Sequence, residues 1–191
     1  MPRTAMPAAA HIRRDTDRYT AAAIALHWLL AVLIASVFSF GLYMTSLEPS
    51  PTKLEYYNWH KWAGVTVLAL SALRLLWRLT HRPPPLRQDL PGWQRAAALA
   101  SRRALYVLFF AVPLVGWAYS SASGYPVVLY GVLPLPDFAS PDRALAAAIK
   151  PWHGRLAWTL AALVLLHVAA ALKHQLIDRD GLLMRMRPGR V

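Results

Sequence analysis

The sequence predicts an all-α integral membrane protein built as a bundle of four transmembrane helices. Hydrophobic residues make up 57% of the 191 residues. Four long stretches carry few charged side chains, and residues 21–44 contain no Asp, Glu, Lys or Arg. Most Lys and Arg residues lie near the ends of these stretches. Because about 20 apolar residues cross the hydrocarbon core of a bilayer, each stretch is long enough to span a membrane.

The four predicted spans are residues 21–44, 58–79, 103–121 and 151–174. The first is too long for the apolar core of a signal peptide and precedes no small-residue cleavage pattern, so we expect it to be retained. The second ends in two arginines and is followed by three successive prolines, which stop a helix. Pro113 and Gly116 predict a kink in the third.

The connection between the third and fourth spans, residues 123–150, is long, apolar and punctuated by glycines and prolines. We expect it to lie on the membrane surface. Within it, Ser140, Pro141 and Asp142 form a helix-start pattern of an N-cap, a first-turn proline and a first-turn acid. This pattern predicts a short interfacial helix over residues 141–149.

The distribution of positive charge predicts the orientation. The two ends of the chain and the middle connection hold 16 Lys and Arg residues, whereas the other two connections hold five. By the positive-inside rule, both termini are cytoplasmic. The predicted organisation is therefore a cytoplasmic tail at 1–18, a membrane domain at 19–178 and a second cytoplasmic tail at 179–191, with the net charge of +12 acting as a topology signal. We expect no nucleic-acid partner, since the cations flank apolar spans and do not cluster on a soluble face.

Four of the seven histidines lie in or at the mouths of the apolar spans: His27, His60, His153 and His167. An ionisable side chain in a membrane is costly unless it is partnered, so such residues mark candidate functional sites. His153 and His167 are 14 residues apart on one predicted helix, which is about four turns and roughly 21 Å, on nearly the same face. The chain has no cysteine, so any metal must be bound through imidazole.

Depth in the membrane pairs these histidines. His27 and His167 lie near the cytoplasmic ends of their spans, whereas His60 and His153 begin their spans from the opposite face. Two bis-imidazole pairs suit two b-type haems, because six-coordinate haem iron takes one axial ligand from each side. Zinc would be left half-coordinated by two histidines. We therefore expect a four-helix bundle that encloses two b-type haems, with axial pairs His27/His167 and His60/His153.

Several motifs together resemble the prokaryotic di-haem cytochrome b561 family. They are ALHW at 25–28, NWHKWAG at 58–64, RLLWRL at 74–79 and LHVAAALKH at 166–174. The resemblance covers residues 19–188 and implies a four-helix membrane bundle with two b haems held by four histidines, which match the four above. It also implies electron transfer between the periplasmic face and ubiquinone in the bacterial inner membrane. Members of the family include superoxide oxidases, and related cytochromes are membrane subunits of hydrogenases and formate dehydrogenases.

The leading hypothesis is an oxidoreductase of superoxide:quinone type that oxidises a small periplasmic donor, with superoxide as a candidate, and reduces the ubiquinone pool. An alternative is a relay subunit that docks on a larger dehydrogenase or hydrogenase. A third is a histidine-bearing transporter or proton relay without haem, and a colourless purified protein would support it.

Four cationic residues complete the candidate sites. Arg74 lies 14 residues after His60, on the same face and at the depth of the cytoplasmic haem, where a guanidinium could bind a haem propionate. Lys61, Lys150 and Arg155 lie close to the periplasmic ligands and are candidates for steering an anion towards that haem. Simpler roles are also open for these cations: Arg74 could extend its guanidinium to the headgroups, and the other three could contact lipid headgroups or haem propionates.

Overall fold

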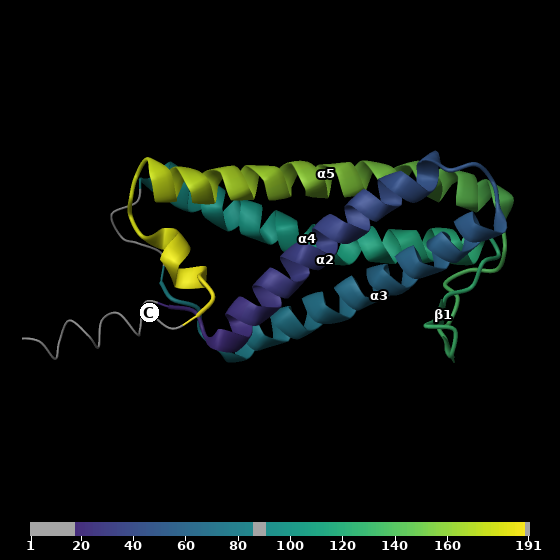
Figure 1. The fold of residues 1–191 in the computed structure, drawn as a ribbon, viewed down its shortest axis with the longest axis horizontal. Coiled ribbons are helices and arrows are strands. Elements are labelled where there is room, and N and C mark those ends of the chain that lie inside the picture. Colours follow the sequence, from purple (N-terminus) through teal and green to yellow (C-terminus); the bar gives the residue numbers. More distant parts are fainter. Residues whose placement is uncertain (1–17, 86–90, 190–191) are drawn as a thin grey trace, which may run out of the picture.

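The computed structural model describes residues 18–85 and 91–189, in which four long helices run side by side as an elongated bundle (Figure 1). These helices are α2 (Ala21–Ser46), α3 (Pro51–Thr80), α4 (Gly92–Ala122) and α5 (Arg143–Leu176). Each is long and apolar enough to cross a membrane. The predicted four-helix membrane fold is confirmed.

Helices α2, α3 and α5 begin at side-chain caps that satisfy first-turn N–H groups, whereas α4 follows Pro91 without such a cap. Thr20 accepts a hydrogen bond from the Ala23 N–H at 3.3 Å, and Ser50 accepts one from the Lys53 N–H at 3.1 Å. Both α3 and α4 start well before the predicted spans at 58 and 103. Apolar content marks the part of a helix inside the membrane, whereas caps and helix-forming residues set where the helix itself begins.

The predicted separate helix at 141–149 is wrong. Residues 143–149 are the first turns of α5, which continues without a break through Pro151. The N-cap is Asp142 and not Ser140, because the Asp142 carboxylate accepts hydrogen bonds from the Ala144 and Leu145 N–H groups at 2.8 and 3.1 Å. A proline lacks one N–H donor, and one missing bond does not end a helix of 34 residues that packs along α4.

The loop between α4 and α5 contains a β-hairpin that periodicity did not predict. Strand β1 (Val128–Leu129) pairs antiparallel with β2 (Leu133–Pro134). Tyr130 and Gly131 adopt positive φ angles of 52° and 74°, and the Val132 N–H donates to the Leu129 carbonyl at 3.1 Å. Two consecutive positive φ angles are typical of a type I′ hairpin turn. Each strand is only two residues long, too short for an alternating pattern to be visible in the sequence.

The interior of the bundle is small. Leu105 and Leu108 of α4 pack with Leu160 of α5 in a buried cluster. Many large apolar side chains face outward instead, including Val32 and Leu165, which are 64% and 70% exposed. Apolar side chains on the outside of helices of this length are suited to contact with the lipid chains of a membrane.

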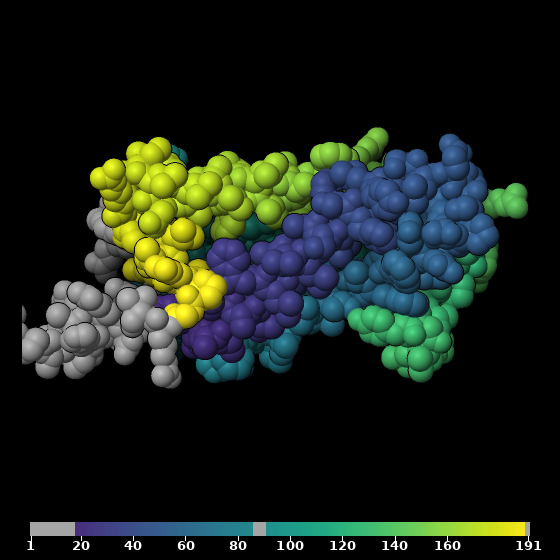
Figure 2. Space-filling model, in the orientation of Figure 1, coloured from purple at the N-terminus to yellow at the C-terminus, as the bar shows by residue number. Residues whose placement is uncertain are grey.

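The C-terminal segment folds back onto the start of α2 (Figure 2). It contains the short 3₁₀ helix η1 (Leu182–Met186), and the Met186 carbonyl accepts a hydrogen bond from the Trp28 indole N–H at 2.8 Å. His174, near the end of α5, bonds to Asp180 at 2.7 Å. This brings the two described ends of the chain to one end of the bundle. Most of the predicted tail at 1–18, and residues 190 and 191, lie outside the described residues.

Candidate haem-binding sites

The four histidines form two pairs at opposite ends of the bundle. His27 of α2 faces His167 of α5, with ring centres 6.2 Å apart and ring planes at 78°. His60 of α3 faces His153 of α5, with ring centres 6.1 Å apart and ring planes at 87°. The structure thus brings together the residues that depth alone had paired.

Both separations fit imidazoles that bind one metal from opposite sides. With a metal–nitrogen bond of about 2 Å on each side and roughly 1 Å from each nitrogen to its ring centre, the two centres should lie roughly 6 Å apart. Over residues 18–85 and 91–189, no third His, Cys, Asp or Glu joins either pair as a possible ligand. Two axial ligands without equatorial ones suit a haem, which brings four equatorial nitrogens itself.

The His153 ring is held in a tautomer suited to coordination. Its Nδ1 lies 3.1 Å from the Val112 carbonyl oxygen of α4. Because a carbonyl only accepts, Nδ1 must carry the proton, which leaves the Nε2 lone pair free. Histidines that bind metals commonly donate their other ring N–H to a backbone carbonyl, a carboxylate or water, and this bond fixes the orientation of the ring. The Nδ1 of His60, its counterpart, is buried without a hydrogen-bond partner.

The His27 ring has a different partner. The Arg74 guanidinium of α3 lies 2.8 Å from His27 Nδ1. A guanidinium only donates, so Nδ1 accepts here, and a neutral ring then carries its proton on Nε2. For His27 to bind a metal through Nε2, the proton must move to Nδ1, so Arg74 must release Nδ1. The released guanidinium would then pair with a carboxylate, which is the partner it prefers.

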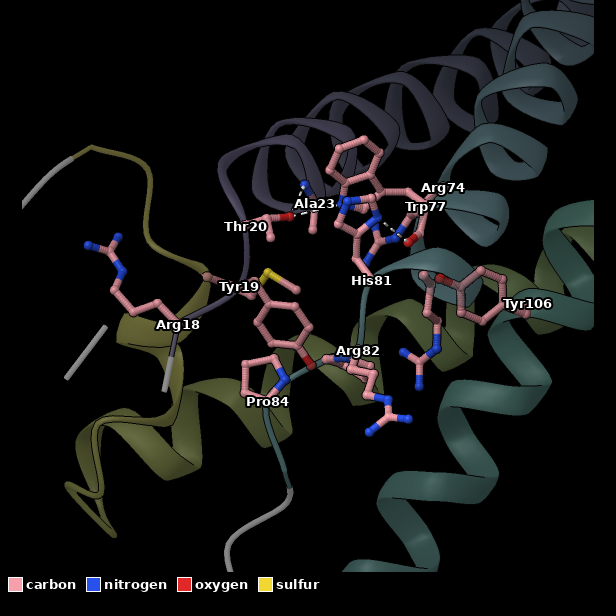
Figure 3. A pocket seen from close by; sticks show the side chains of 13 residues that line it. Arg18, Tyr19, Thr20, Ala23, Arg74, Trp77, His81, Arg82, Pro84 and Tyr106 are labelled. Carbon is pink, nitrogen blue, oxygen red and sulfur yellow. Dashed lines mark hydrogen bonds between the residues drawn. The ribbon is translucent and has the colours of Figure 1, made fainter. Parts of the chain in front are cut away.

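Arg74 also borders a small cavity of about 60 Å³ at the same end of the bundle (Figure 3). Three more arginines line it: Arg18, Arg78 and Arg82. His81 also lines the cavity and, although exposed, stacks on Trp77 with ring centres 3.8 Å apart. The cavity is thus cationic and aromatic, and it suits an acidic group placed beside the His27 pair.

Two glycines give the second pair its space. A Cβ atom on Gly116 would lie 2.8 Å from His153 Cε1, and one on Gly41 would lie 3.0 Å from His60 Cε1. The sequence pattern predicts only a kink at Gly116 and does not single out Gly41. The spacing along the sequence could have indicated Gly41. It follows His27 by 14 residues, the same interval that separates His153 from His167, so it lies on the histidine face of its helix at the level of the second pair. At Gly64 and Gly154, a Cβ would meet no atom within 4 Å.

The three candidate steering cations lie at the His60 end in different settings. The Lys61 ammonium lies 3.2 Å from the Pro126 carbonyl oxygen and 3.5 Å from that of Tyr125. The Arg155 guanidinium lies 5.2 Å from the centre of the Trp152 ring. Lys150 is exposed. These cations are spread around one end of the bundle, and Lys61 is the one that the loop holds in place.

Comparison with known proteins identifies the family. A family model described as prokaryotic cytochrome b561 matches residues 18–189. The chain belongs to the prokaryotic cytochrome b561 family. Cytochrome b561 homolog 2 of Escherichia coli K12 is 33% identical over 178 residues, which cover 89% of this chain and 91% of the relative. Cytochrome b561 homolog 1 of the same organism is 31% identical, covering 91% of this chain and 99% of the relative.

A third relative bears a functional name. The probable superoxide oxidase CybB of Yersinia pestis is 27% identical over 175 residues, which cover 90% of this chain and 96% of that protein. Family membership and the four apolar helices make this chain a multi-pass bacterial membrane protein. As a member of the cytochrome b561 family, it uses b-type haem and transfers electrons.

Proposed function

We propose that this cytochrome b561 binds two b haems and passes electrons across the bacterial inner membrane, from a small periplasmic donor to ubiquinone. His27 and His167 hold the cytoplasmic haem, and His60 and His153 hold the periplasmic one. Each haem supplies an iron that cycles between two oxidation states one electron apart. The observation that carries the proposal is the pair of histidine couples with centres 6.2 and 6.1 Å apart at opposite ends of one bundle.

The spacing of the two proposed sites along the helices supports electron transfer across the membrane. His153 and His167 lie on one continuous helix, 14 residues and roughly 21 Å apart. The Val112 carbonyl fixes the His153 ring, while Arg74 is available to an acidic haem substituent once it leaves His27. The cation distribution of the sequence supports a cytoplasmic position for both termini and hence a periplasmic position for the His60 end.

Superoxide is the donor we propose. Lys61, Lys150 and Arg155 give the periplasmic end cations that attract a small anion. Similarity to the Yersinia protein, a probable superoxide oxidase, supports the same choice. In the balanced reaction, two superoxide anions lose one electron each and become two O₂ molecules. One ubiquinone gains these two electrons and two protons and becomes ubiquinol.

The test is superoxide-driven quinone reduction by the purified haem-loaded protein in proteoliposomes. We expect haem reduction on addition of superoxide, followed by ubiquinol formation in a ratio of one quinol to two superoxide anions. The His60→Ala variant is the inactive control. Haem that superoxide does not reduce, together with co-purification of a larger dehydrogenase, would overturn the proposal in favour of a relay subunit.

A further inference from the structure

The β1–β2 hairpin contacts α3 at successive positions along that helix. The Lys61 ammonium lies near the Tyr125 and Pro126 carbonyls at the base of the hairpin. One residue further along α3, the Trp62 indole N–H donates to the Val128 carbonyl at 2.7 Å.

The last contact belongs to the turn of the hairpin. The Thr66 hydroxyl bonds to the Tyr130 hydroxyl at 2.7 Å, and the Trp62 and Tyr130 rings lie 5.7 Å apart. The turn of the hairpin is therefore fixed against a deeper part of α3 than its base is.

The depth of these contacts follows from helix geometry. Thr66 lies five residues beyond Lys61 on α3, which is about 7.5 Å along the helix axis. Lys61 is the last charged residue of α3 before 12 residues without a charge, so its ammonium belongs to the outer, headgroup side of the interface. The polar layer on each side of a bilayer is roughly 5–7 Å thick. The Tyr130 turn therefore lies near the boundary between headgroups and hydrocarbon and not in the aqueous phase.

The surface of the hairpin suits that depth. Val127 at its base is buried at 1% exposure, whereas Val132 and Leu133 at its outer end are 83% and 56% exposed. Residues 123–136 contain no charged side chain. The hairpin projects sideways from the bundle beside α3 (Figure 1), and the apolar side chains at its outer end are exposed.

We propose that the β1–β2 hairpin is a membrane anchor whose apolar turn inserts into the interfacial layer of the lipid leaflet at the His60 end of the bundle. A two-stranded hairpin has open edges, so it cannot enter the hydrocarbon core, where unpaired N–H and C=O groups are costly. The interfacial layer satisfies those edges and also accepts the apolar side chains, and tyrosine is enriched there. This proposal does not depend on the electron donor or acceptor.

The absence of cysteine from the chain allows a direct test. Val132→Cys is labelled with a fluorophore in haem-loaded protein in nanodiscs of phosphatidylcholine and phosphatidylglycerol. Quenching by aqueous iodide is then compared with quenching by doxyl-labelled lipid. Val32→Cys on the lipid-facing surface of α2 and Asp137→Cys beyond the hairpin serve as matched controls, and Leu133→Cys repeats the measurement at the neighbouring position.

We expect the label at 132 to be quenched several-fold more by doxyl lipid than by iodide, as at 32, and the label at 137 to show the opposite preference. Iodide quenching at 132 equal to that at 137 would place the hairpin in water and overturn the proposal. A label at 132 that neither quencher reaches would also overturn it, because a second protein surface would then cover the hairpin. Haem content measured on each variant shows that the bundle has folded.

Discussion

The two histidine pairs have nearly equal ring separations, yet different groups hold them. At the His60 end, a backbone carbonyl orients His153, and two glycines make room for the rings. At the His27 end, the charged side chain of Arg74 bonds to His27 beside a cavity lined with arginines. One site is thus defined by the backbone of neighbouring helices, and the other by a long side chain that can change its partner.

This difference predicts different redox properties. As a haem ligand, His153 would be made more basic by the carbonyl that accepts its Nδ1 proton, and this would stabilise the oxidised iron. A guanidinium near the other pair stabilises the reduced iron, because reduction removes one positive charge from the site. We therefore expect the haem at the His27 end to have the higher midpoint potential, so that electrons run downhill from the His60 end.

The largest expected effect comes from removing a ligand. His27→Ala or His167→Ala should abolish the haem at that end and leave the other, because an iron that loses one of two axial protein ligands is bound far more weakly. His60→Ala or His153→Ala should do the reverse. Haem content and the reduced-minus-oxidised spectrum measure the outcome. His81→Ala, outside both pairs, should keep both haems, and loss of the same haem from His27→Ala and His60→Ala would disprove the pairing.

Adding a methyl group should weaken the backbone-defined site. Gly116→Ala places a Cβ 2.8 Å from His153 Cε1, and Gly41→Ala places one 3.0 Å from His60 Cε1. Overpacking of this kind costs about 1–3 kcal/mol, a roughly 5- to 140-fold loss of affinity for the haem at the His60 end.

The matched controls are Gly64→Ala and Gly154→Ala, whose added methyl groups meet no atom within 4 Å. Haem titration of the apoprotein gives the affinities. Equal losses in all four variants would show that close approach to the histidine rings is not the reason for Gly41 and Gly116.

Removing the charge from the other site should shift its potential. For Arg74→Gln, we expect the midpoint potential of the haem at the His27 end to fall by roughly 40–60 mV. This shift corresponds to on the order of 1 kcal/mol of lost charge stabilisation. Arg74→Lys, which keeps the charge, should shift it less. A spectroelectrochemical titration resolves the two haems, and an equal shift of both would contradict the assignment of Arg74 to one site.

The smallest expected effect is on the rate at which superoxide reduces the haem. Lys61→Gln combined with Lys150→Gln should slow haem reduction by superoxide about two- to tenfold and flatten its dependence on ionic strength, since fewer cations attract the donor. Stopped-flow absorbance measures the rate. Lys173→Gln, at the opposite end of the bundle, is the control. A rate that responds to neither salt nor the double substitution, with haem content intact, would argue against electrostatic capture.

The sequence was most informative where spacing alone determines position. The 14-residue interval between His153 and His167 placed two sites on one helix, and the order of the spans paired the four histidines by depth. Contacts across helices were not predictable in this way. The bond of His153 to Val112 and the approach of Gly41 to His60 depend on how the helices pack against one another. The periodicity of apolar residues along the sequence does not reveal this packing. The hairpin was missed because strands of two residues leave no pattern.

The most direct test of the two-site account is low-temperature EPR of the oxidised protein, combined with a haem-to-protein ratio. Ring planes at 78° and 87° predict two low-spin ferric centres with the strongly anisotropic signals that nearly perpendicular imidazoles produce. We predict two haems per chain and two such signals, of which His27→Ala removes one and His153→Ala the other. A single haem per chain, or a high-spin signal from the unsubstituted protein, would contradict the account.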